Sequence, residues 1–103
     1  MIIVAVSTTF ASCLQPEILT ENAAGKEVSF QYSSDWDDLA KLVVFDDGVV
    51  GSSVLDTDGF VTIPGEVLTT RGRTLSLYVR GLNASGTPVI TTTRVALGKI
   101  FGA

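Results

Sequence analysis

Hydrophobic and polar residues alternate along much of this chain with a period of two. Every second residue is apolar in the segments 26–32 and 74–80. This alternation predicts strands that bury one face and expose the other. Shorter apolar runs also predict strands, but they do not alternate clearly enough to show which face is buried. About seven strands are expected in all, at residues 2–6, 26–32, 42–45, 49–55, 60–63, 74–80 and 89–97.

Turn residues separate these segments. Asp46-Asp47-Gly48 and Asp56-Thr57-Asp58-Gly59 each join two expected strands, and residues 83–88 close a later hairpin. Pro64 is placed to open a single helical turn, and no segment predicts a helix of three turns. Many short strands separated by such turns are typical of a β-sandwich or barrel. The sequence therefore predicts an all-β, two-sheet sandwich that forms one domain over residues 1–103.

The period-two pattern also predicts a core. Trp36 is the only tryptophan, and it stands just before the apolar run at 42–45. An exposed tryptophan could stack on a sugar or anchor an interface; we favour a position covering one end of the core, as in immunoglobulin-like sandwiches. The predicted core residues are Phe30, Trp36, Leu42, Val44, Leu75, Leu77 and Val79.

Composition narrows the possible partners. The chain has 103 residues, is 46% hydrophobic and 17% charged, and has a formal net charge of −4. Nucleic acids and anionic membrane surfaces are therefore not expected as partners, because both require clustered Lys and Arg. The longest apolar run, Ile2–Val6, is far shorter than the ~20 residues of a membrane-spanning helix. The lone cysteine cannot form an internal disulfide, which fits folding in the cytosol.

Chemistry-bearing residues are few. The chain has no histidine, so imidazole-based triads and imidazole metal ligands are excluded. Cys13 has no cationic neighbour in the sequence and is best interpreted as a small hydrophobe. The acidic segment 35–38 and the turn at 56–59 are weak calcium candidates, since neither supplies a complete loop. We therefore predict no catalytic, cofactor-binding or metal-binding residues, no enzymatic activity, and no small-molecule ligand.

Several segments resemble small structural domains of bacteriophage and prophage virions. An aromatic strand, a loop tryptophan and a Lys…Val-Phe strand recur in that family, followed by an Ile-Pro…Val-Leu element and a Leu-x-Leu-x-Val-x-Gly strand. The matching residues in this chain are Phe30-Gln31-Tyr32, Trp36, Lys41–Phe45, Phe60–Leu68, Leu75–Gly81, Val89–Thr92 and the closing Gly102-Ala103. The resemblance thus covers the chain from about Phe30 onward.

This resemblance implies an immunoglobulin-like antiparallel β-sandwich in a non-enzymatic virion protein. Such domains form head fibres or capsid decorations, or stand at the N-terminus of tail fibre, baseplate or minor tail proteins. It also implies synthesis in the cytoplasm of the bacterial host, and either a stand-alone subunit or the N-terminal anchoring domain of a longer protein. The alternative is a carbohydrate- or receptor-binding module of a phage or bacterial surface protein, which a cluster of exposed aromatics on one sheet face would favour.

The termini supply the candidate interface. The Ile2–Val6 strand has no charged residue, and uncharged strand edges favour pairing with another chain. Two large apolar residues follow the last expected strand. The predicted partners are other virion proteins and the chain itself, with a homotrimer as one possible assembly by analogy with fibres. In the alternative, residues 2–6 pair inside the sandwich and residues 100–101 fold onto its rim. The interface candidates are Ile2, Ile3, Val4, Ile100 and Phe101.

Overall fold

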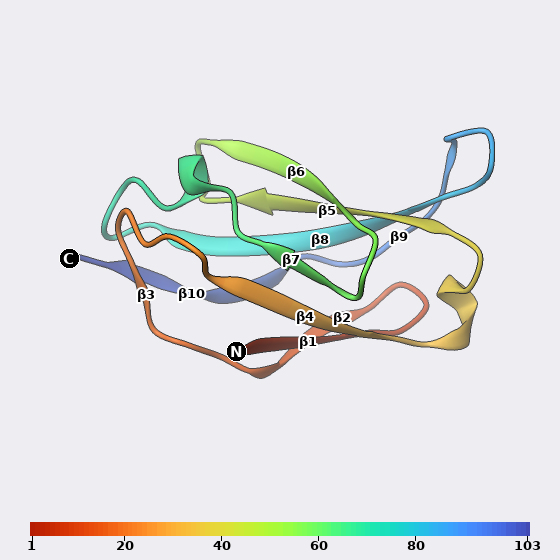
Figure 1. Cartoon of the computed structure of the whole chain (residues 1–103), viewed down its shortest axis with the longest axis horizontal. Helices are drawn as coiled ribbons and strands as arrows, with labels where there is room; N and C mark the ends of the chain where they lie inside the picture. Colours follow the sequence, from red (N-terminus) through yellow and green to blue (C-terminus); the bar gives the residue numbers. More distant parts are fainter.

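The computed structural model describes all residues from 1 to 103, and it is all-β (Figure 1). Its only helical elements are two short 3₁₀ turns, η1 and η2, and no helix is long and apolar enough to cross a membrane. The elements in chain order are β1 (Ile2–Val6), β2 (Ala11–Gln15), β3 (Leu19–Thr20), β4 (Glu27–Tyr32), η1 (Ser34–Trp36), β5 (Ala40–Asp46), β6 (Gly51–Asp56), β7 (Phe60–Thr62), η2 (Gly65–Val67), β8 (Thr74–Leu82), β9 (Pro88–Thr91) and β10 (Val95–Phe101).

Two sheets face each other. The four-stranded sheet has the order β2-β1-β4-β7, and the six-stranded sheet has the order β3-β10-β8-β5-β6 with β9 paired to β8. Together they form a strongly curled sandwich that resembles half a barrel. Most neighbours are antiparallel, but β1 runs parallel to β4 and β10 runs parallel to β3. The expectation of a purely antiparallel sandwich is therefore wrong, and the sheets are mixed.

Ten strands replace the seven that were expected. β2 was missed because residues 11–15 do not alternate clearly, and β3 was missed because it contains only two residues. The segment expected as one strand at 89–97 is divided into β9 and β10 by residues 92–94. The predicted hairpin turns at Asp46–Gly48 and at residues 83–88 are confirmed. The Asp56–Gly59 turn carries the chain from β6 in one sheet to β7 in the other.

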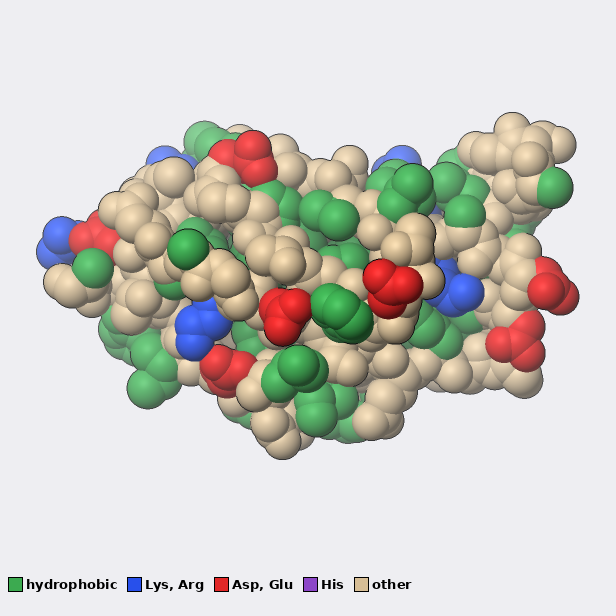
Figure 2. Space-filling view, in the orientation of Figure 1, with side chains coloured by type: hydrophobic (Ala, Val, Ile, Leu, Met, Phe, Trp, Pro, Cys, Tyr) green, Lys and Arg blue, Asp and Glu red, His purple; other side chains and the backbone are tan.

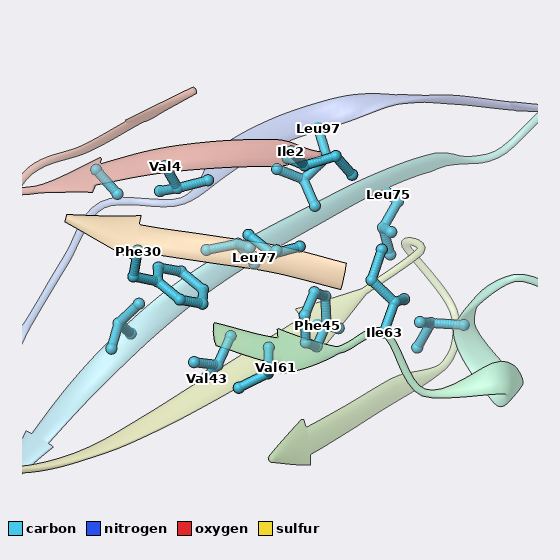
Figure 3. Packing of buried hydrophobic residues seen from close by; sticks show 14 of the residues in the cluster. Ile2, Val4, Phe30, Val43, Phe45, Val61, Ile63, Leu75, Leu77 and Leu97 are labelled. Atoms are coloured by element: carbon cyan, nitrogen blue, oxygen red, sulfur yellow. The ribbon is translucent and has the colours of Figure 1, made fainter. Parts of the chain in front are cut away.

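The inner faces of both sheets form one core of 19 buried residues (Figure 3). Burial is confirmed for Phe30 and Trp36, and for the three predicted core residues of β8. The prediction is wrong for Leu42 and Val44, which lie half-buried on the outer face, because Val43 and Phe45 point inward instead. Strand β5 is apolar on both faces, so its phase is set by its pairing with β8 rather than by its own pattern.

Candidate docking surfaces

The terminal residues proposed as an interface lie mostly inside the fold. Ile2, Val4 and Ile100 are each 0% exposed and belong to the core, so the prediction that they form an exposed surface is wrong. The physical reason is that these side chains point into the sandwich, and β1 itself lies between β2 and β4 without an open edge. Ile3 lies on the outer face of β1 and is half-buried, and Phe101 is 52% exposed.

Trp36 closes one end of the core, as predicted. Its side chain is 0% exposed, and its Nε1–H donates to the Ser7 carbonyl at 3.1 Å. Its ring lies 5.8 Å from that of Tyr32. Gly81 passes so close that a Cβ there would lie 2.8 Å from Leu39 and 3.0 Å from the tryptophan ring. The tryptophan is therefore committed to packing, and Gly81 is the residue that leaves room for it.

The other aromatic residues that could contribute to a sugar-binding face, Phe10, Phe45, Tyr78 and Phe101, do not form one exposed cluster. Phe45 is fully buried in the core. Phe10 follows the turn after β1, Tyr78 lies in the middle of β8, and Phe101 ends β10. The sugar-binding alternative called for several exposed rings on one sheet face, and these rings are dispersed over separate parts of the molecule.

Two aspartates that stood out in the sequence stabilise turns. Asp56 Oδ1 accepts from the backbone N–H groups of Asp58 and Gly59 at 3.2 and 2.7 Å. Its Oδ2 accepts from the Tyr32 hydroxyl at 2.6 Å. Burial, followed by this hydrogen bond, raises the pKa of Tyr32 far above its ordinary value. The Asp56 carboxylate thus links the β6–β7 turn to strand β4.

Asp47 has the same role in the β5–β6 turn. Its Oδ1 accepts from the N–H groups of Val49 and Val50 at 2.9 and 2.7 Å, and its Oδ2 lies 3.0 Å from the Arg73 guanidinium. Burial alone would raise the pKa of Asp47, but these three donors outweigh burial and hold the pKa below its ordinary value. The exposed carboxylates of residues 35–38 do not join these. Nowhere do three or more His, Cys, Asp or Glu side chains gather in the arrangement that a metal ion needs.

A shallow hollow of about 360 Å³ lies beside the start of β4. Its main polar feature is Glu17, whose carboxylate lies 2.6 Å from the Met1 amino group and 2.8 Å from Lys26 Nζ. Hydrogen bonds from Lys26 and then from the amino terminus lower the pKa of Glu17 to about 2. The three charged groups pair with one another, so the hollow is lined by a surface ion-pair cluster.

The outer face of the six-stranded sheet carries apolar side chains at the surface of the molecule. Register places Val44 opposite Tyr78, while Leu42 lies opposite both Leu55 and Arg80. Leu55 is 54% exposed, and the other apolar side chains are half-buried although no element covers them. We call this surface the Tyr78 face, and it consists of Leu42, Val44, Leu55, Tyr78, Arg80 and Arg94.

Two arginines flank the ring at the centre of the Tyr78 face. The Arg80 guanidinium carbon lies 5.4 Å from the centroid of the Tyr78 ring, and that of Arg94 lies 5.9 Å away. Arg94 also forms an ion pair with Asp46 at 3.4 Å, whereas Arg80 has no carboxylate within ion-pair distance. These contacts hold the ring between two cations. Such a face suits a partner that brings apolar side chains and carboxylates together.

Sequence inspection missed this face for a specific reason. The run Leu42-Val43-Val44-Phe45 is apolar throughout, so either pair can be assigned to the core. The sequence did contain a usable signal. A strand of a two-layer sandwich needs only one apolar face, so a run that is apolar on both faces indicates an apolar outer face.

No family model, no curated protein and no solved structure matches this chain.

Proposed function

We propose that this chain is a non-enzymatic structural protein of a bacteriophage virion, acting by protein–protein docking as a head fibre or decoration, or as a fibre or baseplate attachment module. The observation that carries the docking function is the Tyr78 face. It keeps apolar side chains at the surface although the core is already complete on the other side of the same sheet. Exposed apolar groups rimmed by charge are typical of protein-binding surfaces.

The assignment to a virion rests on the sequence resemblance, and the topology supports the immunoglobulin-like part of it. When β1 is set aside, strands β2-β4-β7 face strands β6-β5-β8-β10. That order corresponds to the first, second and fifth strands of an immunoglobulin-like sandwich packed on its four-stranded opposite sheet. On this proposal β1 is an additional strand inserted between the first two strands of the common order and running parallel to β4.

The structure also gives a physical role to residues that carry the resemblance. Gly81, the last residue of the Leu-x-Leu-x-Val-x-Gly motif, is the point where β8 passes Trp36. Pro64, which belongs to the motif at 60–68, precedes the single turn η2, as its preference for the start of a helical turn predicted. These residues specify packing and turns, so they support the fold of the proposed family more directly than its function.

The proposal is tested on purified particles of a phage that encodes the chain. We expect mass spectrometry and antibody labelling to find the chain in the particles. A Tyr78→Asp variant should stay folded and be lost from them, because it places a carboxylate in the centre of the docking surface. Thr62→Asp, which adds the same charge to the exposed outer side of β7, is the matched control and should be incorporated normally.

The two parts of the proposal fail separately. Absence of the wild-type chain from particles would overturn the virion assignment. Normal incorporation of the Tyr78→Asp variant would leave the virion assignment standing and exclude the Tyr78 face as the docking surface.

A further inference from the structure

Charged residues are absent from two stretches of the sequence that meet in the fold. None of the seven Lys and Arg or eleven Asp and Glu residues falls within residues 1–16 or 81–93. These two stretches are far apart in sequence, yet the Thr93 N–H donates to the Thr9 carbonyl at 2.9 Å and joins them in the fold. In Figure 2 the projecting tip of the β8–β9 arm shows no acidic or basic side chain, and the nearest charged residue along β8 is Arg80, which lies opposite Thr91.

Strand β9 in this arm has an open edge. It pairs only with β8, and no strand lies on its other side. The Thr92 N–H donates toward β8, to the Val79 carbonyl at 3.0 Å, while the next N–H, that of Thr93, points the other way. Since backbone groups alternate along a strand, the N–H and C=O of Thr91 also face away from β8. The C=O of Val89 faces the same way, because it shares a peptide unit with the N–H of Ile90.

The edges of β2 and β6 are closed or guarded. The edge of β2 runs beside β10 and is tied to the second sheet at both ends, by the Thr9–Thr93 hydrogen bond and by the pairing of β3 with β10. The edge of β6 lies against η2, where Ser52 Oγ donates to Glu66 at 3.1 Å. Edge strands are commonly protected by charged side chains. β9 has none, and Val89 on it is 54% exposed.

We propose that β9 pairs in antiparallel fashion with β9 of a second copy of this chain, about a twofold axis at Ile90. An open backbone edge requires an extended strand as its complement. A second copy fits because β9 carries no charged side chain, so two β9 edges meet without like charges of the two strands facing each other, although the chain as a whole has a net charge of −4. In this register each Thr91 N–H points at the Val89 C=O of the other copy. The pairing deepens the self-association included in the proposed function.

Sedimentation analysis of the full chain tests the pairing. We expect the wild type to dimerise in a concentration-dependent manner. Thr91→Lys places a cation on the edge and should weaken the dimer by about tenfold or more, because like charges then meet across the axis. Ser85→Lys adds the same charge at the exposed tip of the same arm and is the matched control, which should dimerise as the wild type does. A wild type that stays monomeric at millimolar concentration, or equal effects of the two lysines, would overturn the pairing.

A cross-linking variant checks the register independently. In this register Ile90 of one copy would lie opposite Ile90 of the other. The two residues would form a non-hydrogen-bonded pair, the kind of pair in which opposite side chains lie closest. In a Cys13→Ser background, Ile90→Cys should form covalent dimers on oxidation, and Ser85→Cys should not. Equal yields from both variants would contradict the register. Failure of either experiment would leave particle incorporation through the Tyr78 face unaffected, so the two proposals are separable.

Discussion

The two faces of strand β5 carry similar side chains in opposite environments. Val43 and Phe45 on the inner face are both 0% exposed, whereas Leu42 and Val44 on the outer face are only half-buried. The inner pair packs against the four-stranded sheet, and the outer pair packs only against neighbours in its own sheet, around Tyr78. The inner face accounts for the stability of the sandwich, so the apolar character of the outer face calls for another explanation, and the docking proposed above would provide one.

The largest expected difference between the faces concerns their aromatic residues. Phe45→Ala should lower the free energy of unfolding by about 3–5 kcal/mol, the usual range for a large aromatic side chain deleted from a core. Tyr78→Ala on the outer face should lower it by about 1 kcal/mol or less, because the ring is partly solvated already. Guanidinium denaturation of both variants measures the contrast. Equal losses would mean that the outer face is part of the folding core.

A matched pair of neighbouring valines sharpens the same contrast. Val43→Ala should cost about 2 kcal/mol through lost burial and a cavity. Val44→Ala removes the same atoms from the outer face and should cost under about 1 kcal/mol. The two variants differ only in which sheet face they touch. A Val44→Ala loss as large as that of Val43→Ala would contradict the assignment of faces.

The two faces of β5 also show which features of the fold could be predicted from the sequence and which could not. Strands with a clear alternation, such as β4 and β8, were predicted with the correct buried face, because polar side chains fix their phase. Strand β5 has no such marker, and its phase is set by cross-strand partners that are distant in sequence. The position of β1 inside its sheet was predicted only as the alternative to an exposed strand, since no local pattern states which strands flank it. The Tyr78 face depended on the phase of β5, and the rejection of Ile2 and Val4 as an exposed interface depended on the position of β1.

Two adjacent aspartates at the end of β5 allow the same comparison, between a buried and a more exposed position, for charged side chains. Asp47 is 3% exposed and paired with Arg73, whereas Asp46 pairs with Arg94 on the outer face. Asp47→Asn should cost about 1–3 kcal/mol, because it removes a charged acceptor from a buried network. Asp46→Asn should cost about 1 kcal/mol or less, as for most exposed ion pairs.

The pH dependence of stability separates the two aspartates further. The folded-state pKa of Asp47 is lowered, so its contribution is complete above the ordinary aspartate pKa of about 3.9 and is lost as the pH falls through the lower folded-state value. Urea denaturation between neutral and acidic pH should show a smaller loss of stability for Asp47→Asn than for the wild type. Identical pH profiles would show that Asp47 is not held ionised in the fold.

The smallest effect concerns the order of the Tyr78 face itself. Arg80 stacks over the ring of Tyr78 without any carboxylate partner, and Lys41 Nζ lies 5.2 Å from the centroid of the Tyr32 ring, which packs against the core. Cation–π contacts contribute about 0.5–1 kcal/mol at exposed sites and more where water is excluded. A double-mutant cycle on Tyr78→Leu and Arg80→Met should therefore give a coupling of about 0.5 kcal/mol, with a larger value for Tyr32 and Lys41. A measurable coupling means that the face is ordered before a partner arrives, which lowers the entropy lost on docking. A coupling of zero at Tyr78 would mean that Arg80 is not held against the ring and that any docking partner must order it itself.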